Sequence, residues 1–367
     1  MRSAAGCAAL GLLLLLVAGT FDAEPFYVTG SALILLGAGA AAWIGIGARG
    51  VRVERTLEKR SVVEDEPLVV RVEATAGRLA LPPGFIDEPL LREPVALRAG
   101  RRRARVRIEA SFARRGRRVL APPALVLRDP LGLAQRTITA AGPDEILVLP
   151  RTSPVQMTSA GGEAAGAHSR TLLTASAETE IDGLRTYREG VSASRIHWAS
   201  LAKGGEIMER KMTAEADSRP LIVLDPRGPA SPEGLDAAVR AAGSLVLHFA
   251  RRSGCGLLLP GDRRAAVIDA DLGAWPQAHV RLALLDDSAG PLLSAAQNRR
   301  GLIVFVSARV IDRPPRALGK TPGGLLLVVP GEVGGGRRAV LHVSGCFGYL
   351  GARTGAGAAM EAVGSSA

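Results

Sequence analysis

The sequence is poor in residues that form disulfides, bind zinc or act as nucleophiles. It has three cysteines in 367 residues, Cys7, Cys255 and Cys346, and they lie far apart, so we expect no disulfide. Its five histidines include no pair with the H-x-x-x-H spacing of a zinc site. It also lacks the G-x-S-x-G sequence that presents a catalytic serine on a sharp turn. We therefore expect no nucleophilic triad, no metal and no cofactor.

Two glycine-containing stretches resemble nucleotide-binding sequences but lack the required context. Residues 37–42 fit G-x-G-x-x-A, yet no strand precedes them and the surrounding segment is apolar. Close packing of helices through small residues explains that pattern better. Gly319, Lys320 and Thr321 resemble the end of a phosphate loop, but the position that needs the first glycine is Pro314. Neither stretch predicts a nucleotide site.

Charge is absent from two long runs near the N-terminus, residues 4–20 and 26–48. At 1.5 Å per residue they span roughly 26 and 34 Å as helices, close to the thickness of a bilayer core. Arg2 precedes the first run, and Arg49, Arg52 and Arg55 follow the second, whereas the short loop between the runs has no Lys or Arg. This asymmetry predicts a two-pass hairpin, residues 1–48, in the inner membrane, with the bulk of the chain in the cytoplasm. A cleaved signal peptide is the alternative, and the immediate second apolar run argues against it.

Residues 49–151 show the period-two alternation of a small all-β sandwich, with strands expected over 67–73, 103–110, 119–128 and 145–149. The net charge of the chain is +11, and arginines are concentrated in this region. A solvated strand face and a surface for lipid headgroups or an acidic partner both remain open. Nucleic acid is not the expected partner, because no aromatic residues alternate with these arginines. The basic surface comprises Arg103, Arg105, Arg107, Arg114, Arg115, Arg117 and Arg118.

Residues 152–183 are rich in small polar residues and are predicted to be a linker, and residues 351–367 a disordered tail. Between them, residues 220–350 alternate strands with helices, which predicts an α/β doubly wound domain with helices on both faces of a parallel sheet. One helix should begin after Ser231 and end at Gly254. A second is expected over 275–285. Strands are expected over 221–224, 256–259, 302–306, 325–329 and 339–343.

Residues 184–219 form a segment of unusual composition between the linker and the α/β domain. Its first part, LRTYREGVSASRIHWASLAK, holds one of three tyrosines, one of three tryptophans and one of five histidines. In an extended chain Arg195 and His197 share one face while Ile196 and Trp198 share the other. The segment is interpreted as a domain junction that could also be a docking surface.

This segment resembles the signature of the domain-of-unknown-function-58 family of bacterial membrane proteins. Members carry E-F-x-x-L-R-x-Y-x-x-G-D-x-x-R-x-I-x-W-x-x-S-A-R. The sequence departs from this pattern at Val191, where the family has Asp, and Ile196 is shifted by one position. Upstream family motifs match Arg114-Arg115-Gly116, Pro122 and Asp129-Pro130-Leu131-Gly132-Leu133. The matching signature residues are Glu180, Leu184, Arg185, Tyr187, Gly190, Arg195, His197 and Trp198, with Lys203 near the final arginine.

The resemblance implies a von Willebrand factor A-like fold for the last domain. Such domains hold a divalent cation with D-x-S-x-S after the first strand. Here Asp225 is present, but Arg227 and Pro229 replace the serines. Arginine offers no oxygen ligand and repels a cation, so we expect Arg227 to take the place of the metal against Asp225.

The resemblance also implies a partner, an AAA+ ATPase of the MoxR type. The sequence is therefore interpreted as a non-catalytic, membrane-anchored adaptor that acts in assembly or maturation of envelope or membrane complexes. Its expected partner-binding residues are Arg185, Tyr187, Gly190, Arg195, His197 and Trp198. A hydrolase using His197 with Glu189 or Asp225 is one alternative. An electrostatic binder of lipid or nucleic acid through the arginine surface is another.

Overall fold

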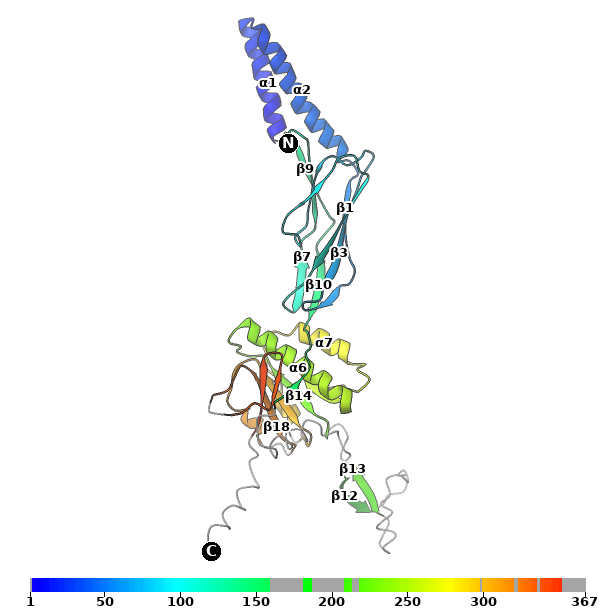
Figure 1. Ribbon diagram of the computed structural model, residues 1–367, viewed down its shortest axis with the longest axis vertical. Helices are drawn as coiled ribbons and strands as arrows, with labels where there is room; N and C mark the ends of the chain where they lie inside the picture. The colour runs from blue at the N-terminus through cyan, green and yellow to red at the C-terminus, as the bar shows by residue number, and fades with distance from the viewer. Residues whose placement is uncertain are drawn as a thin grey trace. The chain divides into compact units, whose positions relative to one another are not determined.

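The computed structural model describes residues 2–158, 181–186, 208–212, 218–297, 299–319, 323–334 and 337–351. The chain divides into two units (Figure 1). Unit 1 comprises Met1–Ala113 and Arg117–Val148, and unit 2 comprises Arg114–Gly116 and Leu149–Ala367. Each unit has its own hydrophobic core, so each is described by itself.

Unit 1 begins with two antiparallel helices, α1 (Arg2–Phe21) and α2 (Glu24–Gly47), which are long and apolar enough to cross a membrane. Glycines let the helices approach closely. A Cβ on Gly11 would lie 2.6 Å from the Gly30 carbonyl oxygen, and a Cβ on Gly37 would lie 2.7 Å from that of Ala4. The G-x-G-x-x-A stretch thus packs helices together, as expected for small residues between membrane helices.

The rest of unit 1 is a β-rich body whose three sheets share one core. Its sheets have the strand orders β1-β3-β6, β2-β10-β7 and β5-β4-β8-β9. The strands are β1 (Arg52–Leu57), β2 (Ser61–Val63), β3 (Leu68–Thr75), β4 (Gly84–Asp87), β5 (Val95–Leu97), β6 (Arg103–Ala110), β7 (Gly116–Leu120), β8 (Ala124–Arg128), β9 (Gln135–Thr139) and β10 (Asp144–Leu149).

The structure differs from the sequence-based expectation at two places in unit 1. The strand expected over residues 119–128 is two strands, β7 and β8, because Pro122 and Pro123 interrupt the ladder. Arg55 was expected to be a flanking membrane charge, but its side chain is only 1% exposed. It donates hydrogen bonds to Glu88, Asp144 and the carbonyl oxygens of Leu120 and Ala121, so it joins separate strands inside the body.

Unit 2 is built on an eight-stranded mixed sheet with the order β11-β19-β20-β18-β17-β14-β15-β16. The four inner strands β15, β14, β17 and β18 are parallel, whereas β16 and β20 run antiparallel to their neighbours. The strands are β11 (Gln156–Met157), β14 (Leu221–Asp225), β15 (Cys255–Leu258), β16 (Ala266–Ile268), β17 (Ile303–Ser307), β18 (Leu325–Pro330), β19 (Leu341–Val343) and β20 (Cys346–Leu350).

Side chains of the inner strands alternate between two cores. Ile222 and Leu224 lie in the core that contains helices α6 (Pro232–Ser253) and α7 (Trp275–Ala283). Leu221 and Val223 lie in the opposite core, with residues from the 3-10 turns η2 (Leu293–Ala296) and η3 (Arg316–Leu318). The expectation of helices on both faces of a parallel sheet is thus wrong for the described residues, because short turns and loops cover the second face and antiparallel strands form the edges.

The expected linker over residues 152–183 also differs from the structure. Strand β11 pairs antiparallel with β19, and the Thr158 amide donates to the Val340 carbonyl. The first part of that stretch therefore belongs to the sheet of unit 2. Strand β12 (Ile181–Thr186), which begins before the expected boundary at residue 184, pairs with β13 (Met208–Met212). The expected tail lies outside the described residues apart from Gly351.

Helix α6 begins and ends as the sequence predicts. The Ser231 hydroxyl accepts a hydrogen bond from the Gly234 amide at 3.2 Å, Pro232 opens the first turn, and Gly254 ends the helix with φ of 74°. The left-handed conformation at Gly254 favours glycine because a Cβ is strained there.

We expect the Ser231→Ala variant to lose about 1 kcal/mol of helix stability, because one amide of the first turn loses its acceptor. Amides of the first turn of α6 should then exchange about fivefold faster with deuterium, as measured by mass spectrometry on the full chain. Ser253→Ala is the matched control, since the Ser253 hydroxyl makes only a 3.5 Å contact at the other end of the helix. Equal exchange rates in both variants and the native chain would contradict the capping role.

Candidate functional site at the carboxyl ends of the central strands

The central strands of unit 2 place two polar residues at a point where the strand order reverses. From β14 the chain continues to β15 on one side, while β17 lies on the other side. In open α/β sheets ligands bind in the crevice at the carboxyl ends of strands at such a point. The last residues of β14 and β17 are Asp225 and Ser307, and they are paired across the ladder. This end of the sheet is therefore the candidate functional site.

An ion pair occupies the site. Arg227 Nε donates to Asp225 Oδ1 at 2.8 Å, and Arg227 Nη2 donates to Oδ2 at 2.9 Å. The Arg227 backbone amide adds a third bond to Oδ1 at 3.2 Å. Asp225 is buried, with 2% of its surface exposed, whereas half of the Arg227 side chain is exposed. The expected contact between Arg227 and Asp225 is therefore present.

The bidentate geometry stabilises the charged form of Arg227. The hydrogen bond and the charge of Asp225 raise the pKa of Arg227 above its already high value. Both carboxylate oxygens accept hydrogen bonds from a fixed cation, so the carboxylate is poorly placed to act as a general base or to ligate a metal. Among the described residues, no three His, Cys, Asp or Glu side chains gather as a metal site would require.

Neighbouring loops shape this end of the sheet. Gly290 lies against the guanidinium, since a Cβ there would be 2.4 Å from Arg227 Cζ. The Ser307 side chain is buried, and its hydroxyl donates to the Arg309 carbonyl and accepts from the Arg309 amide. Ser307 is thus committed to its own turn and is not an available nucleophile.

Among the expected partner-binding residues, the structure describes only Arg185, and only by its backbone. Arg185 lies on β12, where it is paired with Glu209 of β13. Tyr187, Gly190, Arg195, His197 and Trp198 lie outside the described residues, so the docking and hydrolase hypotheses for this segment stay predictions.

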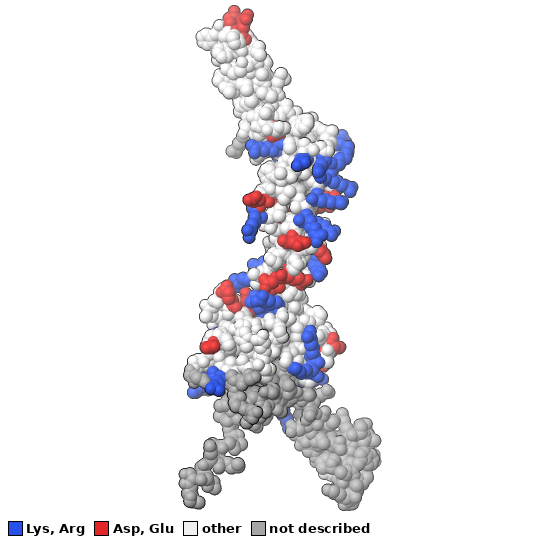
Figure 2. All heavy atoms as spheres, viewed as in Figure 1, with Lys and Arg blue, Asp and Glu red and all other residues white. Residues whose placement is uncertain are grey.

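The basic surface divides into two parts. Arg103, Arg105 and Arg107 project from β6 with 68%, 69% and 64% of their side chains exposed, while Ala104 and Ile108 are buried. Acidic residues accompany them: Arg105 pairs with Glu73 at 3.0 Å and Arg107 with Glu109 at 3.1 Å. Figure 2 shows basic and acidic side chains interspersed along the β-rich body. Arg117, which lies 3.7 Å from Glu145, and Arg118 are also exposed.

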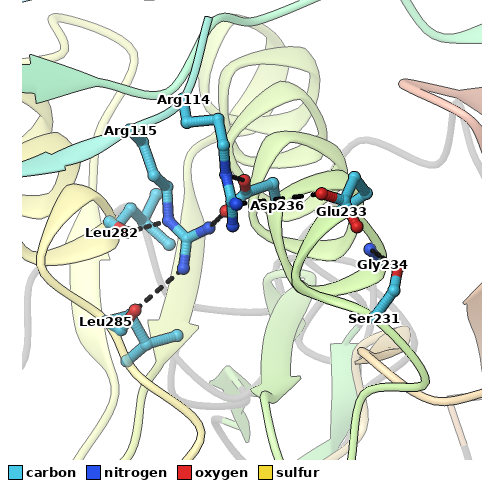
Figure 3. Close-up of polar contacts among 8 residues, drawn as sticks. All are labelled: Arg114, Arg115, Ser231, Glu233, Gly234, Asp236, Leu282 and Leu285. Atoms are coloured by element: carbon cyan, nitrogen blue, oxygen red, sulfur yellow. Dashed lines mark hydrogen bonds and ion pairs between the residues drawn. The ribbon is translucent and has the colours of Figure 1, made fainter.

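Arg115 does not belong to that surface because it is buried, which corrects the prediction for this residue, whereas 46% of the Arg114 side chain is exposed. Both contact Asp236 of α6 in unit 2 (Figure 3). The Arg115 side chain is 4% exposed and also donates to the carbonyl oxygens of Leu282 and Leu285 at 3.2 and 2.8 Å. A buried carboxylate and two carbonyl groups at the end of α7 explain the burial, because they compensate the guanidinium charge. No local sequence pattern could have indicated this long-range contact.

The remaining family motif, residues 129–133, forms the turn between β8 and β9. The buried Asp129 carboxylate accepts from the backbone amides of Leu131 and Ala134, and Gly132 has φ of 71°. A Cβ on Gly132 would lie 2.6 Å from the Arg128 guanidinium. The aspartate and the glycine are therefore explained by the turn itself.

No protein-family model matches the chain, and neither does any curated protein. The family resemblance therefore rests on the motifs alone.

Two cysteines of unit 2 are candidate nucleophiles by residue type but not by environment. Cys255 and Cys346 are both fully buried. Burial raises the pKa of each thiol to about 12. His342, four residues before Cys346, packs against Phe347 with tilted rings whose centroids are 4.9 Å apart. The thiol form is unreactive, so neither residue is poised for catalysis.

We expect Cys255 and Cys346 to resist alkylation by iodoacetamide at pH 8 in the folded chain and to react in urea. The reason is that a pKa of about 12 leaves almost no thiolate at that pH. Peptide mass spectrometry measures modification at each site. Rapid labelling of either cysteine without denaturant would show an accessible thiolate and reopen the nucleophile hypothesis.

Proposed function

We propose that the chain is a non-catalytic binding protein, anchored in the cytoplasmic membrane by α1 and α2, whose unit 2 is a degenerate von Willebrand factor A-like domain. The Asp225–Arg227 pair carries the proposal. A cation-dependent domain of this kind would need an open carboxylate at the end of its first strand. Here Arg227 accounts for both carboxylate oxygens. The Arg227 guanidinium holds the end of β14 in place without a metal. A binding protein needs only this structural role at the strand end.

The proposed partner is an AAA+ ATPase of the MoxR type, and the proposed role is assembly or maturation of envelope or membrane complexes. Support for the partner comes from the resemblance of residues 184–203 to the family signature. The docking surface is assigned to that segment rather than to the strand end, because it concentrates cationic and aromatic residues, which are the types enriched at protein interfaces.

Co-purification from detergent-solubilised membranes tests the partner. We expect the native chain to capture an AAA+ ATPase, identified by mass spectrometry, and the Arg195→Ala, Trp198→Ala double variant to capture at least about tenfold less. The control is Arg251→Ala, Arg313→Ala, which also changes two residues and removes exposed charge from unit 2. Circular dichroism on all samples checks the fold.

The outcomes separate the parts of the proposal. Equal capture by the signature variant would leave that segment without a docking role. Absence of any ATPase from the native sample would overturn the partner itself.

The proposed orientation places the loop between α1 and α2 outside the cytoplasm and the β-rich body inside. We expect a membrane-impermeant maleimide to label an Asp22→Cys variant in intact spheroplasts, because Asp22 is exposed in that loop. A Ser111→Cys variant, exposed in the β-rich body, should react only after permeabilisation. Labelling of Ser111→Cys before permeabilisation would reverse the orientation.

A further inference from the structure

The β-rich body of unit 1 packs against the end of helix α2. A Cβ on Gly47, the last residue of α2, would lie 2.5 Å from Pro82 Cγ. A Cβ on Gly77 would collide with the Arg49 carbonyl oxygen, so the two backbones are in contact there. Residues 77–82 therefore lie directly beside the point where the chain leaves α2.

A second segment, residues 98–102, is bonded to the first. The Leu81 amide donates to the Arg101 carbonyl oxygen at 2.9 Å, and the Gly100 amide donates to the Leu81 carbonyl oxygen at 3.0 Å. The Ala76 amide donates to the Arg102 carbonyl oxygen at 2.8 Å. Residues 49–50, 77–82 and 98–102 thus form one surface beside α2, which we call the helix-end surface.

The helix-end surface carries charge of one sign. It contains no Asp or Glu, and all five of its arginines are exposed. Within the described part of the chain, no hydrogen bond or ion pair engages their guanidinium groups. They differ in this respect from Arg105 of β6, which pairs with Glu73. The five are Arg49, Arg78, Arg98, Arg101 and Arg102.

Aromatic side chains indicate where a membrane surface would cross α2. Tyr27 and Trp43 lie near the two ends of this apolar helix, and both are exposed. Trp and Tyr are enriched where a transmembrane helix meets the lipid headgroups. Gly47 follows Trp43 by four residues, which is about 6 Å along the helix axis. The helix-end surface is therefore within reach of the headgroups of that leaflet.

The same surface exposes one large apolar side chain. Leu79 is 51% exposed, whereas Leu81, two residues further on, is 1% exposed and lies in the core of unit 1. An apolar side chain next to cationic ones is typical of segments that rest in the headgroup region, where the apolar group enters the boundary of the acyl chains.

We propose that the helix-end surface binds the anionic headgroups of the bilayer that α1 and α2 span, and so holds the β-rich body against that leaflet. Anionic lipid is the favoured ligand because the helix end keeps these arginines beside a lipid surface, which attracts each of them when it is negatively charged. The proposal rests on the membrane anchoring of the proposed function and does not involve the ATPase.

Hydrogen–deuterium exchange of the full chain in nanodiscs tests this surface. One set of nanodiscs contains phosphatidylcholine alone, and the other contains phosphatidylcholine mixed with phosphatidylglycerol, at equal ionic strength. The Arg101→Gln, Arg102→Gln variant removes two charges and keeps the carbonyl oxygens that hold the segment. The matched control, Arg60→Gln, Arg118→Gln, removes the same charge from exposed positions. Arg60 follows the far end of β1, and Arg118 lies on β7, beyond the far end of β6.

We expect residues 77–82 and 98–102 of the native chain to exchange at least about threefold more slowly in the anionic nanodiscs than in the neutral ones, because bound headgroups restrict the opening of these segments. The Arg101→Gln, Arg102→Gln variant should lose most of this slowing, and the control should keep it. High salt should also remove the slowing, because it screens exposed charges.

Equal exchange of the native chain in the two lipids would overturn the proposal. It would also be overturned if the Arg101→Gln, Arg102→Gln variant kept the slowing or if the control lost as much of it. The same data test the anchor separately, since amides of α1 and α2 should be protected in both kinds of nanodisc. Ready exchange of both helices would refute the anchoring, and with it the lipid contact.

Discussion

The burial of the central strands of unit 2 on both faces determines where chemistry can occur in that unit. Strands β14 and β17 are buried throughout, and their side chains are apolar until the last residues, Asp225 and Ser307. A polar group in the middle of such a strand would lose its hydration without gaining a partner. Polar side chains are therefore confined to the strand ends, and the candidate site lies there.

The carboxyl end of the sheet carries its own counter-ion. Arg227 neutralises Asp225 from two residues away, so the pair is complete without an external ligand. A site of this kind is suited to holding structure.

Buried arginines connect separate elements within each unit, which the sequence alone could not reveal. Arg55 joins Glu88 and Asp144 within unit 1, and Arg115 joins Asp236 and two carbonyl groups within unit 2. In sequence these residues look like any other arginine of a basic protein. Their partners lie between 33 and 170 positions away, so only the fold brings them together. Buried pairs of this kind require complete hydrogen bonding, because removal of one partner leaves an uncompensated charge.

Features that depend on neighbouring residues could be predicted from the sequence. The ends of α6 follow from Ser231, Pro232 and Gly254, and the alternation of β6 follows from its pattern. The Asp225–Arg227 contact was expected from the family resemblance, and it too joins residues close in sequence. Features set by long-range pairing could not. The antiparallel strands β11, β16 and β20 are short, and their partners are chosen by register. Two prolines also split a strand that looked continuous.

The same distinction limits what the family resemblance can say about a binding partner. The described residues of its upstream motifs have structural explanations: Asp129 and Gly132 build a turn, and Arg114 and Arg115 bind α6. Residues that build turns and secure packed elements are retained for the fold whatever the protein binds. A match at these positions therefore supports a shared architecture and says little about a shared partner. The argument for an ATPase partner must come from residues 187–203, which lie outside the described residues, and that segment is the one on which a test of function should act.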